Sequence, residues 1–474
     1  MFCQLDTLRH CLPSSLRQTL EELPESLDET YERIVIDIKK ANRAQAYRTL
    51  QCLAVAIRPL SVAELAELLA LEFDAAKGGI SKLSADWRWE DHEQAILSTC
   101  SSLVTIVVPH TDGSPVVQFS HFSVKEFLLS DRLATSTKDI SRYHIVLEDA
   151  NTVMARACLC ALLRDFVQND ADANSVSPAR YAAKHWVTHA RIKNVASRIR
   201  DEMEHLFDPD RPYFSGWVQL HDVTHPSWDS ELQSKMQPGA APLYYAAFCG
   251  FHEIVEHLTL KYPSYANAIC GAGGTALHAA SYEGQVHVVR SLLKCGVDVD
   301  ARGYWNQSPL QFASIQGHLS VVQCLLDHGA DAKFQDDNHR TPLSHAAESG
   351  YHEVVRVLLE HDADSNSSDK DGLTPMHGAF LLCHIPKADY PQTVRLLLER
   401  GANPNARDNR RRTPLHLALS SSLASPILLE VARILLAHGA DVEAEDEKGM
   451  SPLQNALASS PAEIAQLLSV YSSK

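Results

Sequence analysis

The sequence predicts a mostly α-helical protein whose second half is a solenoid of about seven stacked repeats. A period near 33 residues supports this, because solenoid repeats bury their apolar faces only by stacking on one another. A second observation is that the first half has helical periodicity, interrupted by one short pair of strands. The repeating Leu or Met precedes an Ala-rich stretch at Leu243, Leu277, Leu310, Leu343, Met376, Leu415 and Leu453, with spacings of 34, 33, 33, 33, 39 and 38 residues.

The clearest copies of the repeat are Thr341–Ala347, which reads TPLSHAA, and Thr413–Ala418, which reads TPLHLA. This pattern resembles the T-P-L-H-x-A signature of the ankyrin repeat. The resemblance implies a domain that holds another macromolecule without performing chemistry, and we expect it to cover residues 236–474. The two longer spacings predict insertions after Ala379 and after Ala418, between the two helices of a repeat.

Residues 44–133 have the element order of a winged-helix domain with a small β-hairpin. Ser61 and Glu64 have the spacing of a capping box at the start of its second helix. We expect residues 1–43 to be a separate helical segment and residues 134–235 to be a helical connector. The predicted elements are helices at 44–57, 61–71 and 91–100, strands at 103–108 and 116–119 around a turn with Asp112 and Gly113, and a helix at 123–133.

Four phrases in the first half carry a second resemblance. They are Leu23–Ile34 (LPESLDETYERI), Arg58–Leu65 (RPLSVAEL), Phe119–Leu128 (FSHFSVKEFL) and Tyr181–Trp186 (YAAKHW). In these phrases, and in the order of its modules, the chain resembles fungal NACHT–ankyrin proteins of the STAND type. The resemblance implies that residues 1–43 are the C-terminal remnant of a NACHT helical region. It also implies a scaffold or sensing arm in signalling of the self/non-self recognition type.

The sequence lacks the motifs with which that family binds and hydrolyses nucleotides. It contains no G-x-x-x-x-G-K-[ST] loop to hold phosphates, and no acidic Mg²⁺ motif follows an apolar strand. We therefore expect no ATP or GTP hydrolysis, no cofactor and no enzyme activity. The alternative is a fragment of a nucleotide-driven NACHT switch that begins inside its NTPase domain, and an in-frame phosphate loop upstream would decide for it.

The charge of the chain argues against nucleic acid and anionic lipid as partners. The formal net charge is −16, and residues from 236 onward contribute half of it, with 18 Lys and Arg against 26 Asp and Glu. An acidic surface repels a phosphate backbone. A winged-helix nucleic-acid binder is the second alternative, but its third helix would present Asp91 and Glu93 beside His92. We expect a protein partner instead.

The cysteines and the hydropathy indicate a cytoplasmic or nuclear protein. The eleven cysteines are scattered and form no C-x-x-C, so we expect buried, reduced thiols without a metal, including Cys158 and Cys160. The first residues lack the apolar segment of a signal peptide. No stretch approaches the roughly 20 apolar residues that a membrane helix needs.

Large side chains at variable repeat positions are the candidate partner-binding residues. In ankyrin folds, partners usually contact the hairpin tips and the inner helices. Tyr304 and Trp305 occupy a predicted tip, and Phe248, Tyr282 and Ile315 occupy inner helices. Exposed aromatic residues are natural interface anchors. The alternative is packing between repeats, which for Phe248 is as plausible as an interface.

Two further candidate sites are a cluster of arginines and a single histidine. Arg410, Arg411 and Arg412, preceded by Arg407, lie at another predicted tip and could contact an acidic partner, although charged tips are often simply solvated. His121 lies in a phrase that resembles the F-x-H-x-S-x-x-E-F motif of NACHT receptors, which implies nucleotide sensing. The alternative is a histidine satisfied by local hydrogen bonds at a helix start, which we favour because the nucleotide domain is absent from the sequence.

Overall fold

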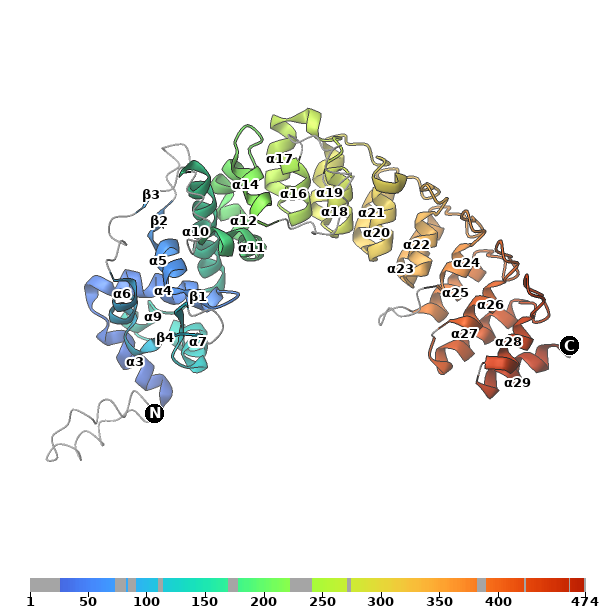
Figure 1. Ribbon diagram of the computed structural model, residues 1–474, viewed down its shortest axis with the longest axis horizontal. Helices are drawn as coiled ribbons and strands as arrows, with labels where there is room; N and C mark the ends of the chain where they lie inside the picture. Colours follow the sequence, from blue (N-terminus) through green and yellow to red (C-terminus); the bar gives the residue numbers. More distant parts are fainter. Residues whose placement is uncertain are drawn as a thin grey trace. The chain divides into compact units, whose positions relative to one another are not determined.

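The computed structural model comprises two compact units, residues 1–225 and residues 226–474 (Figure 1). Several expectations concern residues outside its described part: the segment before residue 26, the turn at Asp112 and Gly113, the end of the connector after residue 221, and most of the insertion after Ala379. The described residues are 26–72, 82–83, 91–109, 114–168, 178–221, 241–270, 274–381, 389–421, 423–459 and 461–472.

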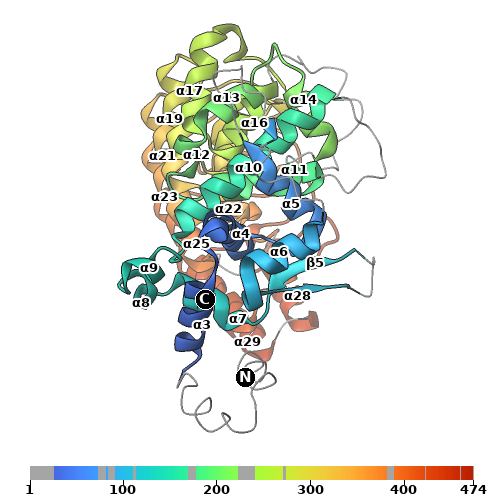
Figure 2. The same ribbon diagram turned by 90° about the vertical axis from the view of Figure 1, so that its left-hand side faces the viewer.

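A winged-helix module forms the centre of the first unit. Its antiparallel sheet has the order β1-β5-β4, with Ser61 opposite Val116 and Ile106 opposite Val117. The predicted capping box of Ser61 and Glu64 is present and starts α5 directly after the short edge strand β1. Strands β4 and β5 run side by side as the wing (Figure 2). The elements are α4 (Arg43–Val55), β1 (Leu60–Ser61), α5 (Val62–Ala70), α6 (His92–Cys100), β4 (Val104–Val107) and β5 (Val116–Phe119), with β2 (Leu71–Glu72) paired to β3 (Lys82–Leu83).

The helix expected at 123–133 is divided into two, α7 (Phe122–Leu129) and α8 (Asp131–Ala134). Ser130 has an extended backbone, and its hydroxyl accepts a hydrogen bond from the N–H of Leu133, so it ends one helix and caps the next. The short helix α9 (Lys138–Ser141) follows. The prediction of one continuous helix was wrong because Ser130 offers a local capping bond that competes with the helical backbone pattern.

Helix α3 (Leu27–Asp37) packs against this region of the first unit. Its buried Tyr31 ring lies 5.5 Å from the ring of Phe127, and its hydroxyl is 2.7 Å from Oγ of Ser123. Arg132 forms an ion pair with Asp28 at 2.9 Å. These contacts fix α3 beside the start of α7.

The connector helices surround a core of four aromatic rings. Trp186 lies 5.2 Å from Trp217, and both rings contact Phe207 at about 6 Å. The indole N–H of Trp217 donates to the carbonyl of Ala183 at 3.0 Å, so the buried polar atom is satisfied. Phe214 completes the cluster. The helices are α10 (Leu147–Gln168), α11 (Pro178–Ala190), α12 (Val195–Arg198), α13 (Arg200–Leu206) and α14 (Tyr213–Leu220).

A buried polar network joins the winged helix to the connector. The hydroxyl of Tyr181 accepts the backbone N–H of Ile57 at 3.3 Å and lies 3.1 Å from Nε2 of His189. The other ring nitrogen of His189 lies 2.8 Å from Oδ1 of Asn151. Burial lowers the pKa of His189 to about 4, so the ring is neutral at physiological pH. The first unit is therefore held together by satisfied polar contacts as well as by its apolar core.

The second unit contains, in its described residues, seven antiparallel helix pairs in a row (Figure 1). The first helix of each pair packs on the first helix of the next, and the second helices do the same. The pairs are α16 (Ala241–Cys249) with α17 (His252–Lys261), α18 (Ala276–Tyr282) with α19 (Val286–Lys294), α20 (Pro309–Gln316) with α21 (Leu319–Asp327), α22 (Pro342–Glu348) with α23 (His352–Glu360), α24 (Pro375–Gly378) with α25 (Tyr390–Glu399), α26 (Pro414–Ser420) with α27 (Ser425–Ala437), and α28 (Pro452–Ser459) with α29 (Ala462–Ser472).

The repeating Leu and Ala residues form the core of this solenoid. Leu277, Leu310 and Leu343 are fully buried, as are Ala346 and Ala347 in the fourth repeat. Small side chains let neighbouring first helices approach closely, which explains the Ala-rich stretch of the repeat. The exception is Leu453 in the seventh repeat, which is only half-buried.

A ladder of side-chain hydrogen bonds reinforces the stack. In the second repeat, Nδ1 of His278 accepts the backbone N–H of Thr275 at 3.1 Å, and Nε2 donates to the carbonyl of Gln307 in the next repeat at 3.0 Å. His377 and His416 repeat this arrangement, bonding to the carbonyls of Arg412 and Met450. Gln311 takes the same role in the third repeat, with Nε2 donating to the carbonyl of Arg340 at 2.8 Å.

One turn of the solenoid has a residue with a side chain where four other turns have glycine. After the second helices of four repeats, the chain turns through glycines with positive φ: Gly296, Gly329, Gly401 and Gly439. In the fourth repeat this position is Asp362, with φ of 60°. A side chain in the left-handed region carries a steric cost that glycine does not have.

We expect Asp362→Gly to stabilise the solenoid by about 0.5–1 kcal/mol, because relief of this steric cost exceeds the extra flexibility of glycine in the unfolded chain. Urea unfolding followed by circular dichroism measures the change. The reverse substitution at an equivalent turn, Gly329→Asp, is the control and should destabilise the solenoid. A Cβ at Gly329 would contact no neighbouring atom, so the only obstacle to the substitution is the positive φ. A loss of stability in Asp362→Gly would contradict this explanation.

Candidate partner-binding surface

The hairpin tips between repeats share one hydrogen-bonded design. At four tips an Asp carboxylate accepts the backbone N–H groups two and four residues further on; at the fourth-repeat tip, Asp336 accepts from Asn338 and Arg340. Backbone hydrogen bonds also join neighbouring tips, such as the N–H of Lys370 to the carbonyl of Asn338 at 3.0 Å. The tips therefore form a regular, rigid row along one edge of the solenoid (Figure 1). The four residues are Asp336, Asp369, Asp408 and Asp446.

The tip at residues 303–307 departs from this design. Gly303 replaces the Asp, so no carboxylate clamps the turn. Trp305 adopts φ of 50° and ψ of 29°, whereas the corresponding residues of the other four described tips do not have positive φ. Its side chain is 57% exposed. A bulky residue in the left-handed region is strained, and such strain gathers at functional sites.

The strained conformation of Trp305 is held by its neighbours. The N–H of Gly303 donates to the carbonyl of Gln307 at 2.9 Å, and the N–H of Asp337 in the next tip donates to the carbonyl of Trp305 at 3.0 Å. The ring of Tyr304 stacks on the indole, with centroids 4.8 Å apart and planes at 24°. The tip thus presents a fixed pair of stacked aromatic rings to solvent.

A chain of contacts connects this tip to the candidate residues on the inner helices. Gln307 bonds to His278, whose ring meets the edge of Phe312 at 5.5 Å, and Phe312 in turn lies 6.1 Å from Tyr282. Tyr282 and Phe312 are each half-buried. Ile315, also half-buried, follows Phe312 by one turn on α20, so the two share a face.

Phe248 lies on α16 and is half-buried. Phe248 follows Leu243 by five residues, as Tyr282 follows Leu277, and α16 packs against α18, so the two residues occupy equivalent positions on neighbouring helices. Its assignment to the partner surface stays a prediction, as does that of the other candidate residues.

Sequence reasoning missed two aromatic residues beside this surface. Phe312 stands where the neighbouring repeat has Ala279, and Phe334 stands where the second repeat has Ala301. The guanidinium of Arg302 lies 5.2 Å above the ring of Phe334. Alignment of the repeats gives the signal that would have found both residues, a large ring where a sibling repeat has alanine.

The fourth repeat is polar at the corresponding places. On α22, His345 stands where the third repeat has Phe312, and Glu348 stands where it has Ile315. Glu348 pairs with Arg340 at 3.0 Å, and Arg340 also approaches Asp369 at 3.7 Å. Among the described residues, the half-buried or exposed rings of Tyr282, Tyr304, Trp305 and Phe312 lie in the second and third repeats. We call Tyr282, Tyr304, Trp305, Phe312 and Ile315 the aromatic surface.

The three arginines predicted to contact an acidic partner differ in their surroundings. Arg410 and Arg411 are exposed, but Arg412 is half-buried and forms two bonds to Oδ2 of Asp408, at 2.7 and 2.8 Å. The side chain of Arg412 therefore supports the turn, while Arg410 and Arg411 face solvent.

His121 caps the N-terminus of α7. Its Nδ1 accepts the backbone N–H of Ser123 at 3.2 Å and lies 2.6 Å from the Oγ of the same residue. The ring is exposed, and its centroid lies 4.3 Å from that of Phe122, with the planes tilted by 38°; Phe122 is itself 69% exposed. These contacts are what we expect of a histidine that caps a helix start through local hydrogen bonds. The role of His121 in nucleotide sensing stays a prediction.

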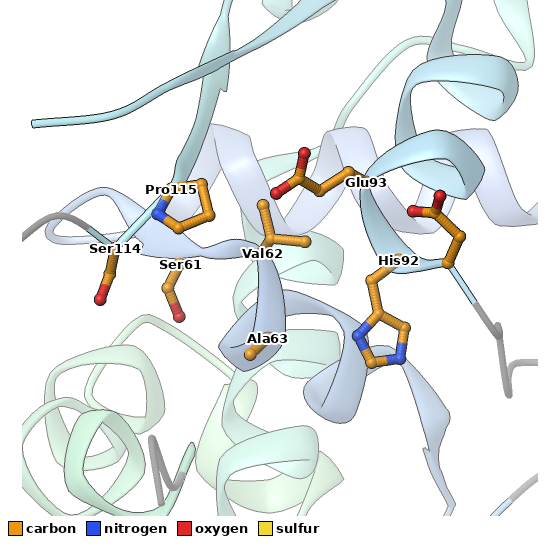
Figure 3. A pocket seen from close by; sticks show the side chains of 8 residues that line it. Ser61, Val62, Ala63, His92, Glu93, Ser114 and Pro115 are labelled. Atoms are coloured by element: carbon orange, nitrogen blue, oxygen red, sulfur yellow. The ribbon is translucent and has the colours of Figure 1, made fainter.

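An open pocket of about 590 Å³ lies on the winged helix, between β1, the start of α6 and the start of β5 (Figure 3). Its Ser61 and Asp91 accept backbone N–H groups of Glu64 and Gln94 as helix caps. Their polar atoms are thus engaged in local structure. The lining residues are Ser61, Val62, Ala63, Asp91, His92, Glu93, Ser114 and Pro115.

The described part of the chain holds no group of three or more His, Cys, Asp or Glu residues arranged to bind a metal. Of the cysteines that the structure describes, only Cys295 is exposed. Burial raises the pKa of Cys52 to about 11 and those of Cys100 and Cys270 to about 12, so these thiols stay protonated and unreactive. Among the described helices, none is long and apolar enough to cross a membrane.

Comparison with known proteins agrees with both modules. The family model for ankyrin repeats matches residues 223–303, 243–336, 310–408 and 381–473. The model for the winged-helix domain of GPI inositol-deacylase matches residues 31–138. These matches give no evidence for a NACHT domain, and that part of the resemblance stays a prediction, as does a fungal origin.

Individual relatives are similar to this chain over parts of its length. Azaphilone pigments biosynthesis cluster protein L of Monascus ruber is 29% identical over 311 residues, which are 62% of this chain and 64% of the relative. The ankyrin repeat domain of Bcl-3, of the IkappaB family, is 25% identical and covers 48% of this chain and 97% of that domain, with a TM-score of 0.41. The human ASB11 ankyrin repeat domain is 26% identical over 48% of this chain and 97% of its own, with a TM-score of 0.42.

The ankyrin matches together extend from residue 223 to residue 473, more than half of the chain, and the seven helix pairs occupy the same region. The mostly helical fold with a solenoid and a preceding winged helix is therefore confirmed. The chain belongs to the ankyrin repeat family.

Proposed function

We propose that the protein binds another protein through the aromatic surface, with Trp305 as the anchor, and performs no chemistry itself. Ankyrin repeats imply a role in protein–protein interaction, and the aromatic surface supplies a place for it. The observation that carries the proposal is the exposed Trp305 at a strained tip that lacks the Asp clamp. The apolar rings of this surface lose unfavourable contact with water when a partner covers them.

The charge of the winged helix supports a protein over a nucleic acid. Asp91 and Glu93 are exposed beside the start of α6, where a recognition helix would meet a phosphate backbone. The absence of a phosphate loop from the sequence and the helix-capping roles of Ser61 and Asp91 in the pocket support a non-catalytic role.

We also propose a scaffold or sensing role in the cytoplasm, within a signalling assembly of the self/non-self recognition type. The order of winged helix, helical connector and repeats supports this, since it is also the order of the NACHT–ankyrin proteins that the sequence resembles. The Monascus relative is named for a pigment biosynthesis cluster. The identities of captured proteins would distinguish a signalling setting from a biosynthetic one.

Affinity capture tests the proposed surface, with the full chain as bait and Trp305→Asn as the variant. The matched control is Leu260→Ala, because Leu260 is an exposed apolar residue on α17, 79% exposed, outside the aromatic surface. We expect partner proteins to be retained by wild type and by Leu260→Ala and to be lost from Trp305→Asn. Equal capture by wild type and Trp305→Asn would contradict the proposal.

A further inference from the structure

A second surface of different chemistry lies at the tip of residues 407–412. Arg407, Arg410 and Arg411 are exposed, and no ion pair joins their guanidinium groups to another described residue. We call these three residues the basic tip. Some other arginines of the solenoid do have carboxylate partners, such as Arg340, which bonds to Glu348 at 3.0 Å. The three cations of the basic tip are therefore available to an external ligand.

The backbone of the basic tip is fixed before any ligand arrives. Oδ1 of Asp408 accepts the N–H groups of Arg410 and Arg412 at 2.9 and 2.7 Å. The N–H of Glu447 donates to the carbonyl of Arg410 at 3.0 Å, and the N–H of Asn409 donates to the carbonyl of Asp371 at 2.9 Å. Both neighbouring tips therefore hold this one in place, which lowers the ordering cost of binding.

Arg411 keeps its side chain at a position where the flanking tips use glycine. Its φ is 58°, while the equivalent Gly372 and Gly449 have φ of 76° and 74°. Glycine carries little cost in this left-handed conformation, and arginine does carry one. As at Trp305, a tip here displays a large side chain on a backbone that disfavours it.

The charges on either side of the basic tip indicate the size of its ligand. Asp371 lies on one neighbouring tip and Glu447 on the other. A long polyanion, such as a nucleic acid or a lipid surface, would place phosphates against both carboxylates. A short acidic segment would place its charges between them, and guanidinium groups match carboxylates in a bidentate geometry.

We propose that the basic tip binds a short acidic peptide segment, with Asp or Glu side chains, of a protein partner. This inference rests on the proposed function in that both take a protein as the ligand. It adds a second contact, three repeats away from the aromatic surface, and specifies its chemistry.

Fluorescence anisotropy of a labelled synthetic peptide rich in Asp and Glu tests the inference on the full chain. The variant is Arg410→Glu with Arg411→Glu. The control is Arg400→Glu with Arg433→Glu, which changes the net charge equally at two exposed positions elsewhere in the solenoid. We expect the tip variant to bind the acidic peptide at least about tenfold more weakly than wild type and the control, and added salt to weaken wild-type binding.

Three results would overturn the inference. They are equal weakening in both charge-reversed variants, no binding by wild type up to about 1 mM peptide, and tighter binding of a single-stranded oligonucleotide than of the peptide. A peptide with Asn and Gln in place of Asp and Glu should not bind. Trp305→Asn should bind the acidic peptide as wild type does, so failure at the basic tip is distinguishable from failure of the aromatic surface.

Discussion

The solenoid is expected to be less stable at pH 5 than at pH 7.5, with His278 alone accounting for about 2 kcal/mol of the loss. Burial lowers the pKa of His278 to about 4, and burial also lowers the pKa values of His377 and His416. In each ring one nitrogen accepts a backbone N–H and the other donates to the next repeat, which requires the neutral form. Protonation would replace the accepting nitrogen by a donor and break the ladder.

The direction of the effect follows from proton uptake. As pH falls below about 6.5, the histidines of the unfolded chain bind protons while those of the folded chain do not. Unfolding is therefore favoured progressively between pH 6.5 and about 4, the pKa of His278 in the folded state. Above pH 7 the histidines are neutral in both states and stability does not depend on them.

The repeats themselves supply a matched control for this prediction. Gln311 performs the same bridging role without a titratable group. The variant His278→Gln, His377→Gln, His416→Gln should keep the ladder and lose much of the pH dependence. Thermal unfolding of both proteins by circular dichroism, between pH 7.5 and pH 4.5, measures it. Parallel losses of stability in wild type and variant would show that the three histidines are not responsible.

Replacing Trp305 by Asn is expected to raise the stability of the solenoid and to weaken partner binding. Asn338 occupies the same position in the next tip without positive φ, and asparagine tolerates the left-handed region better than tryptophan does. Relief of the strain should contribute about 1 kcal/mol to the free energy of unfolding. Loss of the aromatic anchor should cost about 2 kcal/mol or more of binding free energy, close to thirtyfold in affinity.

The substitution is expected to raise the free energy of unfolding and to lower the affinity for the partner. These opposite effects distinguish an interface residue from a packing residue. A residue needed for packing would lower stability and binding together when replaced. Chemical denaturation gives the stability change, and titration calorimetry with a captured partner gives the affinity change. The converse substitution, Asn338→Trp, should destabilise its tip, because it introduces a bulky ring beside a carbonyl that accepts the N–H of Lys370. A lower free energy of unfolding in Trp305→Asn would place the indole among the structural residues.

The solenoid was predictable because its signal is repeated. Leu277, Leu310 and Leu343 have the same burial, so each copy of the pattern reinforces the next. The winged helix was predictable from its hairpin and from the capping box of Ser61 and Glu64. The helix break at Ser130 was missed. Whether a serine caps a helix or lies within it depends on tertiary packing, which the periodicity of one helix does not reveal.

The candidate surface was predictable in composition but not in geometry. Trp305 stood out as a large residue at a tip, yet its left-handed backbone and the lost Asp clamp appear only when the tips are compared in space. The role of Arg412 depended on its distance to Asp408, which sequence spacing does not give. Phe312 was missed because a ring two residues after the repeating Leu resembles a core residue unless the repeats are aligned, which shows Ala279 at the same position.

Hydrogen–deuterium exchange of the full chain, with and without its captured partner, tests whether the partner binds the aromatic surface. We expect slower exchange at residues 303–307 and in α18 and α20 when the partner binds, since these carry the aromatic surface. We expect little change in the second helices α19 and α21. Protection confined to the second helices or to the winged helix, with residues 303–307 unchanged, would contradict the proposed surface.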